Sequence, residues 1–162
     1  MTARDEGALT LLPGGETAGA LLLHNEKTAE YGLTLTRAQA LMLSETHRES
    51  LERAGRVEFG RGAPDRLIDA FCDSPYMARE EYAETLCALI ELFYALKNET
   101  EIGDDRLIAL MRTAFDETRG AAELMEDEVL RRVREARGQR ALQRGKPQAQ
   151  GNFFEGAALK SS

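Results

Sequence analysis

Apolar residues recur at steps of three and four along most of the chain, which is the spacing of amphipathic helices. The pattern is strongest over residues 78–97. Its broad apolar face consists of Tyr82, Leu86, Leu89, Ile90, Phe93 and Leu96, with Cys87, Leu92 and Tyr94 on the flanks. Because so much of this segment is apolar, we expect it to be a central helix around which the others pack.

A second helix is predicted over residues 37–54 by signals at both of its ends. The hydroxyl of Thr36 suits an N-cap, and Gly55 suits the left-handed residue that follows a helix. The residues predicted to face inward are Ala40, Leu43, His47, Ser50, Leu51 and Ala54.

Weaker patterns predict four more helices, over residues 16–31, 64–72, 104–115 and 121–137. The first follows a turn at Pro13-Gly14-Gly15 and ends at Gly32; the others are marked by Pro64, by an Asp104 cap and by Gly138. Predicted core positions of the first and last are Leu21, Leu22, Ala29, Tyr31, Leu124, Met125, Val129 and Val133.

Two short segments, Leu33–Leu35 and Val57–Phe59, alternate apolar and polar residues as strands do. The expected fold is therefore all-α, a compact bundle of five or six helices around the helix at 78–97. The alternation also predicts a minimal two-stranded ribbon, in which residues 33–35 pair with residues 57–59.

The predicted domain spans residues 16–137, after a flexible lead-in at residues 1–15. Residues 138–162 are expected to form a disordered basic tail. Gln, Gly, Arg and Lys dominate there, so the segment cannot bury enough apolar surface to offset the entropy of ordering.

Charge separates the body from the tail. The chain carries −7, of which residues 129–162 contribute +6 and residues 1–128 contribute −13. An acidic body of that size repels phosphates and argues against nucleic acid as a partner of the domain.

The sequence contains no apolar run of roughly 18 residues that could cross a membrane, and its start does not resemble a signal peptide. Two cysteines, Cys72 and Cys87, are too few for a disulfide scaffold. We therefore expect a cytoplasmic protein without membrane contact.

Few residues are candidates for chemistry. His47 could act as a general base, but Glu45 and Glu49 are two positions away and lie on other sides of a helix. Cys72 lies at the C-terminal end of its predicted helix, where the helix dipole disfavours a thiolate. No metal-binding, phosphate-loop or nucleophile motif occurs, so we expect no catalytic residue, metal or cofactor. His24 is predicted to be structural.

A basic arm follows the body. Its arginines are Arg131, Arg132, Arg134, Arg137, Arg140 and Arg144. They could bind nucleic acid or an acidic partner, but they also suit the C-terminal end of a helix, and no aromatic residue lies among them.

Several phrases of the chain resemble a family of uncharacterised bacterial proteins of the Clostridia type, known only as a domain of unknown function. They include residues 25–28, 31–36, 55–60, 70–76, 81–86 and 97–100. The resemblance spans residues 24–128 and implies a small cytoplasmic bacterial protein, with no catalytic residue or partner to carry over.

Two of these segments, residues 70–76 and 97–100, are more polar than packing requires. The candidate functional surface therefore consists of Asp73, Tyr76, Asn98 and Glu99. The alternative is that Asp73 and Asn98 cap helix ends.

The leading hypothesis is a non-enzymatic helical module that binds another protein of unknown identity. One alternative is a small enzyme that uses Cys72 or His47. Another is a nucleic-acid-associated protein that acts through the basic arm. Homodimerisation through an apolar helix face is compatible with the pattern, and nothing in the sequence specifies it.

Overall fold

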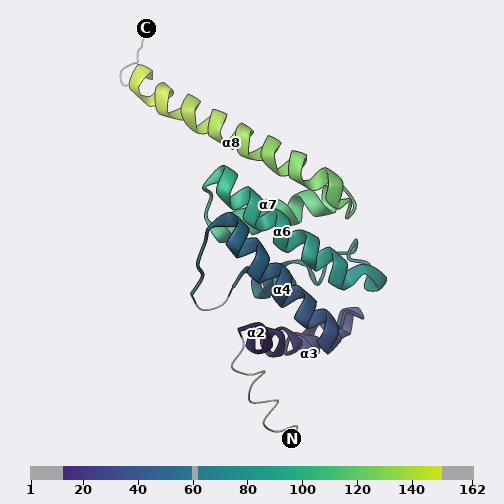
Figure 1. Cartoon of the computed structure of the whole chain (residues 1–162). Helices are drawn as coiled ribbons and strands as arrows, with labels where there is room; N and C mark the ends of the chain where they lie inside the picture. Colours follow the sequence, from purple (N-terminus) through teal and green to yellow (C-terminus); the bar gives the residue numbers. More distant parts are fainter. Residues whose placement is uncertain (1–12, 60–61, 151–162) are drawn as a thin grey trace, which may run out of the picture. The chain divides into compact units, whose positions relative to one another are not determined.

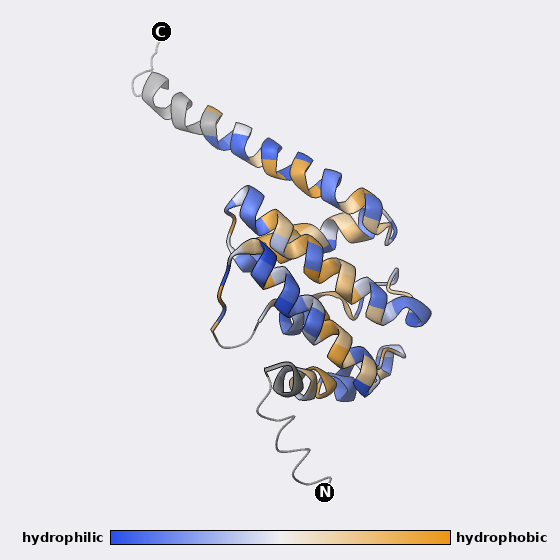
Figure 2. Ribbon diagram, viewed as in Figure 1, coloured by the Kyte–Doolittle hydropathy of each residue, from blue (hydrophilic) through white to orange (hydrophobic). Residues whose placement is uncertain are grey.

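The predicted central helix is α6 (Tyr82–Thr100), which packs against α4, α5 and α7 (Figure 1). The structure, a computed structural model, describes residues 13–59 and 62–150. Every residue predicted for the broad apolar face of α6 is buried, and Tyr94 from its flank is buried too. Figure 2 shows more orange along α6 than along α4, as expected for a helix with neighbours on several sides.

The remaining elements follow in chain order. They are α2 (Pro13–Leu22), α3 (Asn25–Thr28), the 3-10 helix η1 (Ala29–Tyr31), α4 (Arg37–Ala54), α5 (Ala63–Phe71), the 3-10 helix η2 (Arg79–Glu81), α7 (Asp104–Glu117) and α8 (Ala122–Gln150). α2 packs on α4, and α5 packs on α7. The described residues contain no strand, so the all-α prediction is confirmed. The chain divides into one unit up to Glu126 and a second from Asp127 onward.

Both predicted ends of the helix over residues 37–54 are confirmed. The Gln39 backbone N–H donates to Thr36 Oγ1 over 3.1 Å, and the Thr36 N–H donates to Gln39 Oε1 over 2.9 Å. This capping box satisfies two donors that a helix start leaves free. At the other end Gly55 has φ +68°, which glycine adopts without strain.

The prediction of one helix over residues 16–31 is wrong, because the helix begins at Pro13 and breaks after Leu22. The amide of Asn25 donates to the carbonyl of Leu35, and the N–H of Leu35 donates back to Asn25 Oδ1, both over 2.9 Å. Such side-chain bonds to the backbone compete with a continuous helix. Ala18 and Leu21 before the break are buried, whereas Ala29 and Tyr31 after it are exposed, contrary to the prediction for these two. The predicted end at Gly32 is confirmed, with φ +74°.

The predicted ribbon does not form, and the same contacts explain why. The backbone of Leu35 is paired with Asn25, while Thr28 Oγ1 donates to the carbonyl of Leu33 over 2.6 Å. Residues 33–35 are thus satisfied by side chains of the preceding turn, and no partner strand is needed. Residues 56–59 have no strand structure either.

Further helix ends differ from the prediction. The central helix runs over residues 82–100, after the 3-10 helix η2, rather than over 78–97. Asp104 is the first residue of α7 rather than its cap, and Gly103 takes the cap position. α8 continues through Gly138 to Gln150, so the predicted stop at residue 137 is wrong. Gly138 costs the helix about 1 kcal/mol relative to alanine, and the Arg, Gln and Ala residues that follow it favour continuation. Met125 is buried and Leu124 is exposed, contrary to the prediction that both face inward.

The predicted flexible lead-in (residues 1–15) and the end of the predicted tail lie largely outside the described residues, which exclude 1–12 and 151–162. The domain limits at 16–137 therefore stay a prediction. None of the helices in residues 13–59 and 62–150 combines the length and the apolar composition that a membrane span requires.

Candidate functional site

The segment between α4 and α5 presents its apolar residues to solvent. We call its described part, residues 56–59, the outer loop (Figure 1). Apolar and polar residues alternate along it (Figure 2). Val57 is 77% exposed and Phe59 is 90% exposed, whereas Glu58 between them is half-buried. The alternation therefore has the opposite orientation to that of a surface strand, whose apolar residues face the core.

Glu58 is held inward by two side chains from different helices. His47 Nε2 on α4 lies 2.8 Å from Glu58 Oε1, and the Tyr94 hydroxyl on α6 donates to Glu58 Oε2. His47 Nε2 also lies 3.0 Å from the Tyr94 oxygen. A carboxylate only accepts hydrogen bonds, so Nε2 must carry the proton in this contact. We call these three residues the clamp, since they fasten the outer loop to α4 and α6.

Electrostatics inside the clamp favour a charged Glu58. Burial, the largest influence, acts to raise the pKa of its carboxyl, but the hydrogen bonds from His47 and Tyr94 outweigh burial and leave the pKa below its ordinary value. Burial and the bond to Glu58 both raise the pKa of the Tyr94 hydroxyl, which therefore stays protonated and donates. The clamp thus contains one carboxylate with a donor on each oxygen.

Gly62 packs directly against the clamp. A Cβ atom at this position would lie 2.7 Å from Glu58 Oε1 and 2.9 Å from His47 Cε1. Real Cβ atoms do not approach other atoms so closely, so any larger residue would displace one of these side chains. Gly62 also occupies the N-cap of α5, where extended backbone is normal.

A polar cleft of about 250 Å³ adjoins the outer loop. It is lined by Arg56, Val57, Glu58, Phe59, Arg66, Phe93, Tyr94, Lys97 and Asp104. Asp104 joins two of the cations, with Oδ1 at 2.9 Å from Lys97 Nζ and Oδ2 at 3.1 Å from Arg66 Nη1. His47 is absent from the lining, so the clamp presents only Glu58 and Tyr94 to the cleft.

Asn98, a residue of the predicted surface, fixes the start of the outer loop. Its amide donates to the carbonyl of Ala54 over 3.0 Å, and Arg56 Nε donates to Asn98 Oδ1 over 2.8 Å. Ala54 is the last residue of α4, where carbonyl groups lack helical partners. The expected capping role of Asn98 is thus met on α4, not on its own helix. Glu99 is exposed.

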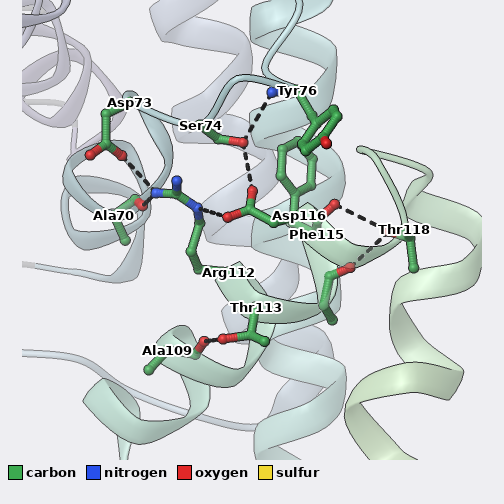
Figure 3. A network of polar contacts seen from close by, with 11 residues as sticks. Ala70, Asp73, Ser74, Tyr76, Ala109, Arg112, Thr113, Phe115, Asp116 and Thr118 are labelled. Carbon is green, nitrogen blue, oxygen red and sulfur yellow. Dashed lines mark hydrogen bonds and ion pairs between the residues drawn. The ribbon is translucent and has the colours of Figure 1, made fainter.

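Asp73 and Tyr76 belong to a separate network centred on Arg112 (Figure 3). Arg112 Nη1 donates to Asp73 Oδ1 over 2.6 Å and to the carbonyl of Ala70 over 2.7 Å. Arg112 Nε donates to Asp116 Oδ2 over 2.9 Å. The hydrogen bond from Arg112 lowers the pKa of the Asp73 carboxyl.

The same network continues to the residues before α6. Ser74 Oγ donates to Asp116 Oδ1 over 2.8 Å and accepts from the Tyr76 N–H over 3.2 Å (Figure 3). Together these bonds fasten the segment between α5 and η2 to α7. Asp73 binds Arg112 of α7, and the Tyr76 N–H binds Ser74 of its own segment, whereas Asn98 binds α4. The structure therefore does not bring the four predicted surface residues into one cluster.

The other chemical candidates have structural contacts. Cys72 is buried, and burial raises the pKa of its thiol, which opposes nucleophilic reactivity. Burial also raises the pKa of Cys87, whose sulfur accepts a hydrogen bond from Thr46. His24 lies between two carboxylates of α5, at 2.7 Å from Asp65 and 3.4 Å from Asp69. No group of three or more His, Cys, Asp and Glu side chains placed to hold a metal occurs in residues 13–59 and 62–150.

The basic arm lies on α8, and part of its charge is balanced within that helix. Arg131 Nη2 and Arg132 Nε lie 2.6 and 2.9 Å from Glu128 Oε2, and Arg131 Nη1 lies 2.6 Å from Glu135 Oε2. Arg134, Arg137 and Arg140 are exposed. The side chain of Arg144 lies outside the described part of the chain.

Sequence reasoning missed the partner of His47. Glu45 pairs with Arg48 on the helix surface. The carboxylate that contacts His47 belongs to Glu58, not to Glu45 or Glu49. Tyr94 is separated from His47 by 47 positions, so no local pattern could join them. The one available signal was the alternation over residues 56–59, which also fits a strand.

Comparison with known proteins gives a family and no function. No curated protein and no solved structure matches the chain. The family described as "Family of unknown function (DUF6323)" matches residues 20–142, a range that extends beyond the expected 24–128 at both ends. The resemblance to a domain of unknown function is thus confirmed, while its Clostridia origin stays an expectation. Because the match covers most of the chain, the chain belongs to the DUF6323 family of unknown function.

Proposed function

We propose that this protein is a non-enzymatic helical module that binds another protein through the outer loop. The observation that supports this is the orientation of residues 57–59, in which Glu58 is clamped inward and both apolar neighbours face solvent. Single exposed apolar residues are common on proteins. Two of them held outward by a half-buried polar contact form a fixed surface for a partner.

The size of the effect limits what the loop can do alone. Full burial of Val57 and Phe59 would contribute roughly 3–6 kcal/mol together. A micromolar complex needs about 8 kcal/mol, and a stable interface covers about 800 Å² on each partner. The outer loop is therefore the apolar centre of a larger interface, and the partner also covers polar surface beside it.

The test compares capture of partners by three forms of the full chain. The wild-type protein, a Val57→Ser/Phe59→Ser variant and a Leu23→Ser control are tagged and recovered from native lysate, and co-purifying proteins are quantified by mass spectrometry. Leu23 is 70% exposed, so the control removes a comparable apolar side chain elsewhere. We expect a stoichiometric protein that the control retains and the loop variant loses. Identical recovery by all three forms, or no stoichiometric protein with any, contradicts the proposal.

Catalysis by His47 is a second candidate, because its imidazole contacts a carboxylate and a phenol beside a cleft. A general base needs a ring nitrogen within reach of the substrate. Nε2 is occupied by Glu58 and Tyr94, and His47 does not line the cleft, so the contacts fit a clamp better. His47→Gln distinguishes the two roles: loss of partner binding together with faster proteolysis of the outer loop supports the clamp.

A further inference from the structure

The cleft beside the outer loop is too small for a typical cofactor and large enough for a side chain. Its volume is about 250 Å³. Small-molecule sites usually span roughly 300–1,000 Å³, whereas a water molecule occupies about 30 Å³ of liquid. The cleft therefore fits one side chain of a partner together with a few water molecules.

Both carboxylates of the cleft have their oxygens occupied. Glu58 accepts from His47 and Tyr94, one on each oxygen. Asp104 contacts Lys97 with one oxygen and Arg66 with the other. Asp105 lies 3.9 Å from Arg66, but its side chain is 97% exposed, so solvent screens that pair. With Arg56, Arg66 and Lys97 opposite Glu58 and Asp104, the lining has an excess of one positive charge.

Arg56 carries that excess. Its Nε donates to the amide oxygen of Asn98, and its Nη2 lies 3.5 Å from the carbonyl of Lys97. Within residues 13–59 and 62–150 its hydrogen-bond acceptors are thus neutral. A guanidinium has five N–H donors, so several remain for a further acceptor. A carboxylate would form a charge-assisted, two-point contact with them.

From this arrangement we propose that the cleft binds the carboxylate of an Asp or Glu side chain in the partner, next to an apolar residue that packs on Phe59. The inference rests on the proposed function and names the chemistry of the partner: an acidic–apolar peptide segment. Arg56 supplies the charge and Phe59 supplies the adjacent apolar surface, while Lys97 and Arg66 balance the carboxylates of the lining.

The net charge of the whole body favours a single acidic side chain over a polyanion as the ligand of the cleft. Residues 1–128 carry −13, which opposes the approach of a polyanion such as nucleic acid. One carboxylate is affected mainly by charges within about 8 Å at physiological ionic strength. The cleft therefore accepts a single acidic side chain while the body as a whole disfavours a run of them.

The experiment uses the full chain and a library of random seven-residue peptides displayed on phage. The tightest selected peptide is synthesised with its acid and with the matching amide, and both are titrated against wild type, Arg56→Ala and Arg37→Ala. Arg37 is an exposed arginine at the opposite end of α4 and serves as the control. We expect selection of peptides with Asp or Glu beside an apolar residue, and about tenfold weaker binding of the amide form to wild type.

The decisive quantity is the coupling between the peptide acid and Arg56. In Arg56→Ala the acid and amide peptides should bind equally, whereas Arg37→Ala should keep the tenfold difference. Arg56→Lys retains the positive charge but removes the paired guanidinium donors, so it should keep only part of the tenfold difference in affinity. Urea unfolding of each variant shows whether the fold is intact.

Other outcomes overturn the inference and separate it from the proposed function. Selected peptides without an acid, or an acid–amide difference that persists in Arg56→Ala, exclude the carboxylate site. If Phe59→Ala still abolishes binding of those peptides, the outer loop remains a binding surface. If Phe59→Ala leaves their binding unchanged, the outer-loop function fails as well. Failure to select any peptide, with loop-dependent capture of a lysate protein, excludes only the acidic–apolar segment.

Discussion

Two connecting segments of this molecule are fastened to the helices by polar networks, yet they differ in what they leave exposed. The Arg112 network holds the segment between α5 and η2 against α7 and includes the carbonyl of Ala70 (Figure 3). Cys72, Ser74 and Met77 of that segment are buried. The clamp holds the outer loop through Glu58 and leaves Val57 and Phe59 in solvent.

The difference separates a structural contact from the surface that we propose for binding. In the first segment the polar bonds accompany the burial of Cys72, Ser74 and Met77, and Tyr76 is 41% exposed, well below Val57 and Phe59. In the outer loop the polar bonds act against burial, because fixing Glu58 inward directs its neighbours outward. The apolar residues there are therefore free for an external partner.

Loss of Arg112 should have the largest effect on stability. Arg112→Met removes the partner of Asp73 and Asp116 and leaves the Ala70 carbonyl without its donor. Because Arg112 is only partly buried, we expect a loss of about 2 kcal/mol. Urea unfolding measures it, with Arg106→Ala, an exposed arginine on the same helix, as a control that should change by less than about 0.5 kcal/mol. An equal effect of the two variants would refute a structural role for the network.

A change at Gly62 should test the packing of the clamp. Gly62→Ala is expected to displace Glu58 or His47 and cost about 1 kcal/mol. Gly103→Ala is a matched control, since Gly103 caps α7 with extended backbone and has no atom within 4 Å of an added Cβ. Both variants replace a glycine N-cap by alanine, so the cost of displacing the clamp is the additional loss of Gly62→Ala over Gly103→Ala. Denaturant unfolding of the two variants, with limited proteolysis of the outer loop, measures the difference. Equal free energies of unfolding and equal proteolysis rates would mean that the clamp side chains can move aside at no measurable cost in stability.

Acid should weaken the clamp. The pKa of Glu58 is lower in the folded protein than in the unfolded chain, so its contribution to stability is complete above the unfolded pKa and is lost as pH falls through the folded value. Glu58→Gln should therefore cost up to about 1 kcal/mol at pH 7 and less at pH 3. Unfolding free energies of both proteins from pH 7 to pH 3 measure this, and a gap that widens in acid contradicts it. Asp73, whose pKa is also lowered, contributes a background loss common to both proteins.

The smallest effect on stability is expected at Phe59. Phe59→Ser removes an apolar side chain that solvent already surrounds, so the free energy of unfolding should change by less than about 0.5 kcal/mol. Partner capture should nevertheless be lost. A large loss of stability in this variant would show that Phe59 supports the fold, and the contrast between the two segments would disappear.

Local signals predicted those parts of the fold in which neighbouring residues decide the outcome. Thr36 and Gly55 mark the ends of α4 because capping depends on residues within one turn. The face of α6 follows from spacing alone. The prediction of one helix over residues 16–31 was wrong because Asn25 bonds to Leu35, ten positions away, and no periodicity in the sequence indicates that contact.

By itself, then, the sequence determined an all-α protein with a central helix, expected over residues 78–97 and found over 82–100, and a separation of charge between body and arm. Helical periodicity and net charge depend on residue order and composition, so they need no knowledge of distant contacts. Only the tertiary structure joined His47 to Glu58 and Tyr94, turned Phe59 outward and left Arg56 with neutral acceptors in the described part of the chain. Those features depend on contacts between side chains 11 to 47 positions apart, and the longest of them form only because α4 and α6 pack together.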